Sequence, residues 1–250
     1  MKRKLVAALA CRNQGSRLYG KPLQNLDIQN GVSILEHMIQ WLRTIPQIDD
    51  IVLGISTGLD NLCFVEFAKK HQLGHILGDE QDVLSRLIAC GESAQATDIF
   101  RLTTESPFTY FEGIAQAWQE HVSGNYDCTF LDHVPDGSGI EIHKLGALKY
   151  SHENGQKRHR SELCSLYIRE NKDKFKINHL PVPPEIHRPD IRLTVDYPED
   201  LVLCRKVYER FRDFAPRIPL VEIIKFLDEN PDIKNLVAPF VADGLKTMYL

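Results

Sequence analysis

The sequence lacks the cysteine and hydrophobic patterns that mark several large protein classes. Its six cysteines are widely spaced, since the two nearest, Cys63 and Cys90, stand 27 positions apart, so there is no CxxC pair and no zinc-ribbon spacing. We expect small buried thiols in a reducing cytoplasm. No segment approaches the ~18 consecutive apolar residues of a membrane span. These absences favour a cytoplasmic protein with no membrane partner.

A basic excess is missing as well. The chain has 30 Lys and Arg against 34 Asp and Glu, a net charge of −4. A broad nucleic-acid-binding surface needs a basic balance, so we expect no nucleic-acid partner, although a small cationic pocket stays compatible with this charge. The length of 250 residues fits one large domain or two small ones. Because no linker or repeat interrupts the chain, we predict a single domain over 1–250 with an inserted arm over about 136–185.

Strand-like and helix-like segments alternate through the first half. Short apolar runs predict buried strands, and apolar residues at helical spacing predict helices. This rhythm is typical of an α/β fold with a mostly parallel sheet and helices on both faces, in which ligands bind outside the carboxyl ends of the strands. The expected strands are 4–10, 50–56, 75–78, 98–104 and 126–132, and the expected helices are 32–45, 60–71 with Asp60 as its N-cap, 82–94 and 110–122.

The second half of the chain is less regular. A strand leads into a helix over 139–153, and a polar, basic loop follows at 154–163. Proline punctuation in VPPEIHRPD excludes regular structure there. The remaining expected elements are a helix over 161–171, an extended segment over 174–182, a strand over 191–196, and helices over 198–211 and 219–231.

Two common phosphate-binding motifs are absent, because neither GxxxxGK[ST] nor GxGxxG follows the first expected strand. The segment ACRNQGSRLYGKPL stands there instead and places Arg12, Arg17 and Lys21 within ten residues. Gly15 lets the backbone approach a ligand closely, and amides beside it can form an anion-binding concavity. Arginines bind phosphate oxygens in a fork, and a lysine adds a point charge. We interpret the segment as a phosphate-binding loop, with a solvated charged loop as the alternative.

Two carboxylates are expected at the same edge of the sheet as this loop. Glu105 follows the strand 98–104 in RLTTESPF, and Asp196 ends the strand 191–196 in RLTVDYPEDL. Mg²⁺ prefers carboxylates together with substrate phosphates, so the pair predicts a magnesium site opposite the phosphate-binding loop. Helix capping is the alternative role for Asp196, because Pro198 opens the next helix.

A further segment, VPDGSGIEIH, offers candidate acceptor contacts. Asp136 lies in a turn, and Glu141 and His143 alternate on one side of the strand after it. An exposed turn without a binding role is the alternative. The basic loop 154–163 lacks metal-ligand spacing, and its His159 is a candidate contact to an anionic acceptor.

These segments together resemble the cytidylyltransferases that activate sugars for surface polysaccharides, a superfamily that includes CMP-Kdo and CMP-acylneuraminate synthetases. The likeness is strongest to the spore-coat-polysaccharide branch. The matching pieces span nearly the whole chain in family order: ACRNQGSRLYGKPL, LGDEQDVLSR, RLTTESPF, DGSGIEIHKLGAL, SELCSLYIRENKDKFKI and RLTVDYPEDLVLCRKVY. The chain departs from the family at Glu105, where aspartate is usual; the added methylene moves the oxygens by roughly a bond length, and Mg²⁺ demands strict geometry.

The resemblance implies a Rossmann-like nucleotidyltransferase fold with a protruding arm often used for homodimerisation. It implies transfer of CMP from CTP to a sugar, sugar-acid or phosphorylated acceptor, with release of pyrophosphate. A nucleotide-binding regulatory homologue without transferase activity is the alternative, and a dinucleotide-dependent oxidoreductase is a more remote one. The implied residues are Ala10, Arg12, Gly15, Ser16, Arg17, Lys21, Asp82 and Arg86 for the nucleotide, with Arg12, Arg17 and Lys21 also catalytic, Glu105 and Asp196 for Mg²⁺, and Asp136, Glu141 and His159 for the acceptor.

Overall fold

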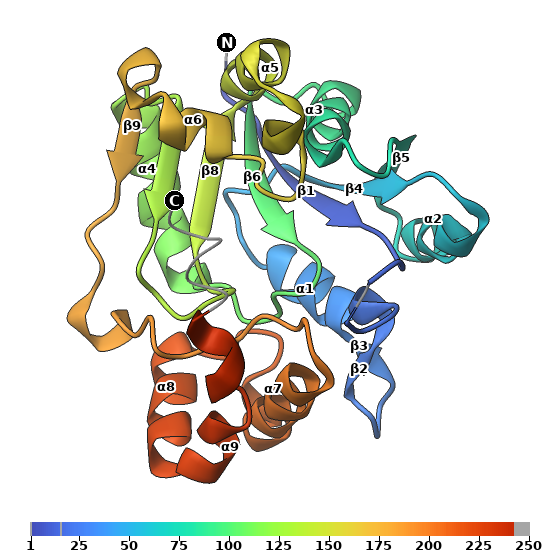
Figure 1. Cartoon of the computed structure of the whole chain (residues 1–250), viewed down its shortest axis with the longest axis vertical. Helices are drawn as coiled ribbons and strands as arrows, with labels where there is room; N and C mark the ends of the chain where they lie inside the picture. Colours follow the sequence, from blue (N-terminus) through green and yellow to red (C-terminus); the bar gives the residue numbers. More distant parts are fainter. Residues whose placement is uncertain (1, 16, 243–250) are drawn as a thin grey trace.

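A seven-stranded sheet forms the centre of the computed structural model, which describes residues 2–15 and 17–242 (Figure 1). The strand order is β5-β4-β1-β6-β8-β7-β9, and β8 runs antiparallel to both of its neighbours while the other pairs are parallel. The mostly parallel sheet is therefore confirmed. Its strands are β1 (Leu5–Cys11), β4 (Asp50–Ser56), β5 (Gly74–Gly78), β6 (Asp98–Thr103), β7 (Cys128–Leu131), β8 (Ile140–Lys144) and β9 (Ile177–His179), and β2 (Asn25–Asp27) and β3 (Val32–Ser33) form a separate pair.

Strand β1 shows why the sheet needs helices on both faces. Its side chains alternate between two cores: Leu5, Ala7 and Leu9 pack into one, and Val6 and Ala8 into the other. Every one of these residues is fully buried, as expected for a strand covered on both sides. The first core is completed by α1 (Ile34–Leu42), α2 (Leu62–Lys70) and α4 (Ile114–Ser123), and the second by α3 (Val83–Ser93), α5 (Leu145–Asn154) and α6 (Leu166–Glu170).

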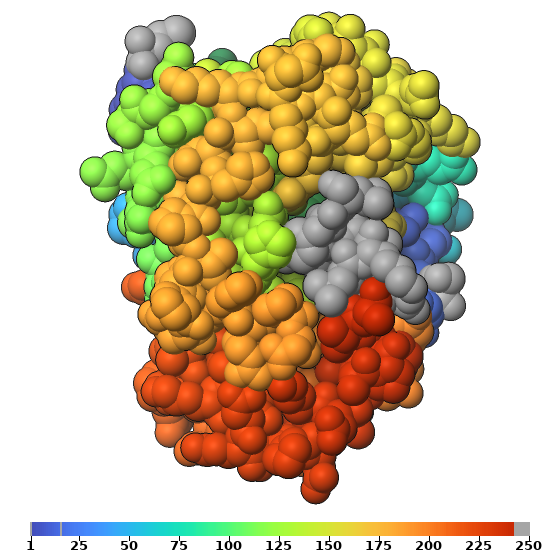
Figure 2. Space-filling model, turned by 60° about the vertical axis from the view of Figure 1, so that its left-hand side comes forward, coloured from blue at the N-terminus to red at the C-terminus, as the bar shows by residue number. Residues whose placement is uncertain are grey.

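Three helices gather at the lower end of the molecule in Figure 1: α7 (Pro198–Arg210), α8 (Leu220–Glu229) and α9 (Pro231–Asn235). The segment that follows β9 runs down the surface and lies against them (Figure 2). Arg188 of that segment binds Asp228 of α8 at 2.6 Å, and Asp190 binds Lys234 of α9 at 2.5 Å. Among the residues that the structure describes, no helix is long and apolar enough to cross a membrane.

Three predicted helix starts are wrong, and one of them is that of α4, which was expected from residue 110 and begins only at Ile114, after a short 3-10 helix. Asp60 does not cap α2; it lies in a short 3-10 helix (Leu59–Asn61), and Asn61 occupies the cap position without a side-chain cap hydrogen bond. The Asn61 side chain instead accepts a hydrogen bond from the backbone of Asn13, 2.8 Å away. The helix expected over 161–171 begins only at Leu166, because the residues before it form turns over the cleft described below.

The predicted strand over 191–196 is also wrong, and its backbone explains why. Apolar and polar residues alternate along the segment as in a strand, and residues 191–195 are all buried, but its hydrogen bonds go to loops rather than to a strand. The amide of Asp136 donates to the carbonyl of Ile191 at 2.9 Å, and the amide of Leu193 returns a bond to Asp136 at 2.7 Å. The amide of Val195 donates to the carbonyl of Glu105 at 2.8 Å. The segment therefore binds the loops after β6 and β7 to one another.

Residues 136–185, predicted as a protruding arm, contribute to the main body of the protein. They supply β8 and β9 to the central sheet, and α5 and α6 pack into the second core. The predicted basic loop 154–163 contains a short 3-10 helix, Lys157–Arg160. Use of this region for dimerisation stays a prediction.

Candidate active site

The loop after β1 has a tight backbone that requires its glycines. The amide of Gly20 donates to the carbonyl of Asn13 at 2.9 Å, and Gly20 has a φ of 61°, in the left-handed region that favours glycine. A Cβ at Gly15 would lie 2.2 Å from the carbonyl oxygen of Leu18, so no side chain fits there. The bond from Asn13 to Asn61 ties the loop to the next crossover. Ser16 lies outside the described residues.

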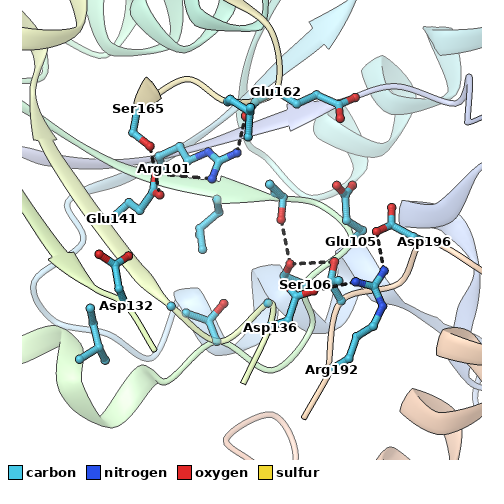
Figure 3. A pocket seen from close by; sticks show the side chains of 18 of the residues that line it. Arg101, Glu105, Ser106, Asp132, Asp136, Glu141, Glu162, Ser165, Arg192 and Asp196 are labelled. Atoms are coloured by element: carbon cyan, nitrogen blue, oxygen red, sulfur yellow. Dashed lines mark hydrogen bonds and ion pairs between the residues drawn. The ribbon is translucent and has the colours of Figure 1, made fainter. Parts of the chain in front are cut away.

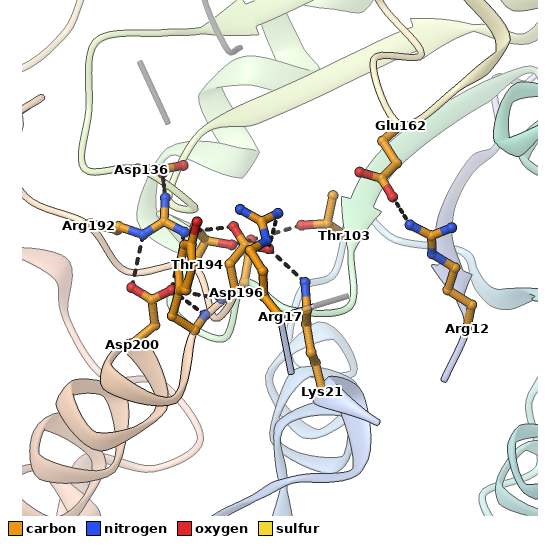
Figure 4. Close-up of polar contacts among 12 residues, drawn as sticks. Arg12, Arg17, Lys21, Thr103, Asp136, Glu162, Arg192, Thr194, Asp196 and Asp200 are labelled. Carbon is orange, nitrogen blue, oxygen red and sulfur yellow. Dashed lines mark hydrogen bonds and ion pairs between the residues drawn. The ribbon is translucent and has the colours of Figure 1, made fainter. Parts of the chain in front are cut away.

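Two of the three loop cations converge on one carboxylate (Figure 4). Lys21 Nζ lies 2.6 Å from Oδ1 of Asp196, and an Arg17 guanidinium nitrogen lies 3.2 Å from the same oxygen. Arg12 points the other way and pairs with Glu162, from the loop before α6. The loop cations are therefore neutralised by acids from distant parts of the chain, at the positions where an anionic ligand would bind.

Arg17 is further supported by a stack of aromatic rings. Its guanidinium carbon lies 4.9 Å from the centroid of the Tyr197 ring. Phe240, from the chain beyond α9, stacks on Tyr197 with ring centroids 4.0 Å apart and an interplanar angle of 10°. The C-terminal helices thus help to hold a residue of the cationic loop.

A buried arginine organises the opposite wall. Arg192 is 3% exposed and binds three carboxylates: Asp136 through Nη1 at 2.6 Å, Asp196 through Nη2 at 2.6 Å, and Asp200 through Nε at 2.9 Å. Asp200 also accepts the backbone amides of Asp196 and Tyr197, so Asp200, and not Asp196, caps α7. The carboxylate of Asp196 is thereby left to face the cationic loop.

Two of the three aspartates on Arg192, Asp136 and Asp196, have pKa values shifted in opposite directions. Burial raises the pKa of Asp136 to about 6, and Arg192 offsets only part of that effect. Burial also acts to raise the pKa of Asp196, but the hydrogen bond and charge of Lys21, with Arg192 and Arg17, bring it below its usual value. Asp196 is therefore ionised at neutral pH.

Glu105 faces the same space from the loop after β6. Among the described residues, its carboxylate has no hydrogen-bond or ion-pair partner. Burial raises its pKa, while the nearby charge of Lys21 lowers it and that of Asp196 raises it. The side chain is half-buried and lines the cleft described below, so the unpartnered carboxylate of Glu105 is open to a cation, as expected of a metal ligand.

A cleft of about 220 Å³ joins these groups to a second polar cluster (Figure 3). Glu105, Asp196 and Arg192 lie at one end, and Arg101, Glu141 and Ser165 at the other. Asp136 lies at the first end, where it binds Arg192. Gly137 is required beside it, because its φ is 89° and a Cβ there would lie 2.8 Å from the amide nitrogen of Thr194. The cleft therefore brings the predicted metal residues together with two of the predicted acceptor residues.

A smaller hollow of about 50 Å³ adjoins the cleft at the end of β1. Ala10, Arg12 and Arg86 line it, as predicted for nucleotide contacts. Arg86 is 1% exposed and donates to the carbonyls of Cys11 and Gly54, at 3.1 and 2.9 Å, so it also holds the ends of β1 and β4 together.

Two predicted site residues are placed elsewhere. Asp82 is the N-cap of α3, accepting the amide of Ser85 at 2.8 Å, and its other oxygen binds His152 at 2.7 Å. His159 is 4% exposed, and its Nε2 lies 2.9 Å from Glu170. Neither lines the cleft or the hollow, so the structure does not bring these side chains to the rest of the site.

Several cleft residues were missed by the sequence analysis. Arg101 and Arg192 each interrupt an apolar run. A charged residue in such a run predicts a buried ion pair, so this signal could have identified both arginines. Asp132 follows β7 in the same way that Glu105 follows β6. Glu162 and Arg169 gave no comparable signal, because each has a polar or charged neighbour, Ser161 or Glu170, and does not interrupt an apolar run.

Known proteins that this chain resembles include a protein family, a curated relative and solved structures. The profile of the family described as Cytidylyltransferase matches residues 7–230. The spore coat polysaccharide biosynthesis protein SpsF of Bacillus subtilis is 26% identical over 234 residues, which cover 90% of this chain and 94% of that protein. A cytidylyltransferase from Leptospira borgpetersenii superposes with a TM-score of 0.82 at 21% identity, covering 94% of this chain and 97% of the other.

A second solved structure has the same fold at a greater distance. It is CMP:2-keto-3-deoxy-manno-octonic acid synthetase complexed with CTP, with a TM-score of 0.61 and 15% identity over 83% of this chain and 99% of that one. The family match begins within β1 and includes the other strands, the cationic loop, Glu105 and Asp196. The chain belongs to the cytidylyltransferase family.

Proposed function

We propose that the protein transfers CMP from CTP to a small acceptor and releases pyrophosphate. The observation that carries this proposal is the pairing of Lys21 and Arg17 of the cationic loop with Asp196, which lines the same cleft as Glu105, in a chain of the cytidylyltransferase family. An acceptor oxygen would attack the α-phosphorus of CTP as pyrophosphate leaves. Positioning and charge neutralisation supply most of the catalysis in such a transfer.

Lys21, Arg17 and Arg12 would bind the triphosphate. In the structure, acid oxygens of Asp196 and Glu162 take the positions beside these cations, and phosphate oxygens would replace or join them. Lys21 is the most enclosed of the three, with a side chain 14% exposed. We assign to Lys21 and Arg17 the stabilisation of charge on the departing pyrophosphate.

Glu105 and Asp196 would hold Mg²⁺. The described residues include no cluster of three or more His, Cys, Asp or Glu side chains arranged for a metal, so phosphate oxygens must supply ligands too, as is usual for Mg²⁺. The unpartnered carboxylate of Glu105 and the ionised Asp196 fit this donor set. When bound, Mg²⁺ supplies charge stabilisation on the phosphate oxygens.

The biological setting is part of the proposal. The name of the SpsF relative supports a role in surface polysaccharide biosynthesis, with a sugar-type acceptor. We propose that the protein acts in the cytoplasm as a homodimer. Light scattering of the whole chain measures its molar mass and so tests the dimer.

The experiment is a pyrophosphate-release assay with each nucleoside triphosphate, Mg²⁺ and a panel of sugar acceptors. We expect release with CTP and at least one acceptor, and loss of release when Mg²⁺ is chelated. Glu105→Asp restores the family's usual residue and keeps the charge, so it should retain turnover, whereas Glu105→Gln should lose it. CTP binding without release in both the wild type and Glu105→Asp would favour a nucleotide-binding protein without transferase activity.

A further inference from the structure

Asp196 pairs with three cations at the first end of the cleft (Figure 4). Lys21 Nζ and an Arg17 guanidinium nitrogen lie 2.6 and 3.2 Å from Oδ1, and Arg192 Nη2 lies 2.6 Å from Oδ2. Asp200 fixes the backbone of Asp196 by accepting its amide at 2.8 Å. Both carboxylate oxygens of a residue that we assign to the metal are therefore engaged by side chains of the protein.

The three cations are not equally bound to the rest of the protein. Arg192 is 3% exposed and also pairs with two other aspartates, so its bond to Asp196 belongs to a buried network. Lys21 and Arg17 come from the loop after β1, and among the described residues each has Asp196 as its ion-pair partner. The two loop cations can therefore leave Asp196 while Arg192 stays in place.

The two carboxylates assigned to the metal differ in their partners. Glu105 lines the same cleft as Asp196, and among the described residues it has no ion-pair partner. A divalent cation that binds both carboxylates must compete with Lys21 and Arg17 for Oδ1 of Asp196, and the positive charge of these side chains repels it. The contacts of the loop therefore lower the affinity of the site for a metal that arrives alone.

A triphosphate changes this competition. Phosphate oxygens bind lysine and arginine as carboxylates do, so they compete with Asp196 for Lys21 and Arg17. Once the phosphates hold these cations, Oδ1 of Asp196 is open to the metal, to which the phosphates also supply ligands. The pairing seen in the structure excludes neither ligand. It sets a cost that each ligand removes for the other, and such a coupling is reciprocal.

We propose that Asp196 exchanges Lys21 and Arg17 for the divalent cation when the nucleoside triphosphate binds, so that metal and nucleotide bind as a coupled pair. The identity of the two ligands rests on the proposed function. Arg192 holds Oδ2 throughout the exchange, and the Tyr197 ring, 4.9 Å from the guanidinium carbon of Arg17, keeps that side chain beside the site. Metal alone and nucleotide alone are each expected to bind more weakly than the two together.

The first test measures nucleotide affinity in the absence of metal. Calorimetry of the whole chain with CTP in EDTA compares the wild type with Asp196→Asn, which keeps the shape of the side chain and removes the charge that holds Lys21 and Arg17. Glu105→Gln is the matched control, because it removes a charge from the same cleft that pairs with no described cation.

Asp196→Asn should bind metal-free CTP about ten-fold or more tightly than the wild type does, within the usual range of coupling between sites, and Glu105→Gln should gain clearly less. A residue that acts only as a metal ligand would leave the metal-free affinity unchanged, and a purely structural residue would lower it on substitution. Either result, or an equal gain in Glu105→Gln, would overturn the proposal.

The second test measures metal affinity in the absence of nucleotide, by electron paramagnetic resonance of Mn²⁺ with the whole chain. Lys21→Ala with Arg17→Ala removes both competing cations, and Lys21→Ala alone serves if the double variant does not fold. The gain over the wild type should be about ten-fold or more, should disappear when Asp196→Asn is added, and should be absent in Lys206→Ala, an exposed position of α7. Wild-type protein that binds Mn²⁺ as tightly as Lys21→Ala, or a gain that survives Asp196→Asn, would overturn the exchange.

These binding measurements are separate from turnover. Pyrophosphate release with CTP and Mg²⁺, combined with no gain in either test, overturns the exchange and leaves the proposed transferase standing. Gains in both tests without release support the exchange and count against the transferase.

Discussion

Asp136 provides a quantitative test of the electrostatics of the cleft. Its pKa rises from 3.8 to about 6, because burial disfavours its charge more than Arg192 favours it. A shift of about two units corresponds to about 3 kcal/mol, since each unit is worth about 1.4 kcal/mol. An acid whose pKa is raised on folding lowers the free energy of unfolding when it ionises. This loss of stability is absent below pH ~4 and complete above pH ~7, where the acid is ionised in both the folded and the unfolded state.

Asp136→Asn removes the charge and keeps the shape. The free energy of unfolding of this variant, relative to the wild type, should therefore increase by about 3 kcal/mol between pH 4 and pH 8. Urea denaturation at both pH values measures it, and the comparison across pH cancels any constant effect of the amide. Asp213→Asn, at an exposed position, should show no such increase. A variant that is less stable than the wild type by the same amount at both pH values would refute the reasoning.

The other predictions concern the nucleotide loop, the cleft turn and the aromatic stack. Lys21→Ala should lower kcat by about 100- to 1,000-fold in steady-state assays, because it removes one electrostatic contact to the transition state. Lys206→Ala, on the exposed surface of α7, should leave kcat unchanged, and equal rates for the two variants would exclude the role of Lys21. Gly137→Ala should destabilise the protein by about 1 to 3 kcal/mol because of its φ and the close Thr194 amide, whereas Gly146→Ala, in an open helical position, should be neutral or slightly stabilising in thermal melts. Phe240→Ala should weaken CTP binding several-fold in calorimetry by releasing the ring that supports Arg17, and an unchanged affinity would contradict that support.

The elements of the sheet were predictable from the sequence because short buried strands leave a plain apolar pattern. The range of β4 was predicted without error, and β1 was displaced by one residue at each end. The segment 191–196 has the same pattern, yet its partners are loops, and a pattern of burial does not reveal what the backbone binds.

The site was predictable in part, since strand ends at one sheet edge bring Lys21, Glu105 and Asp196 together. Its long-range ion pairs were not predictable. The contact from Arg12 to Glu162 spans 150 positions, and the fork from Arg169 to Asp132 spans 37. Local sequence carries no information on such pairings, so these ion pairs are visible only in the folded chain.

The central claim is that this cleft breaks the bond between the α- and β-phosphates of CTP. ³¹P NMR of CTP incubated with the whole chain, Mg²⁺ and the sugar panel tests it directly. The account predicts that the three CTP resonances are replaced by one phosphodiester resonance, from CMP joined to the acceptor, and by the resonance of pyrophosphate. Formation of CDP with inorganic phosphate, or CTP that stays intact with every acceptor, would contradict it.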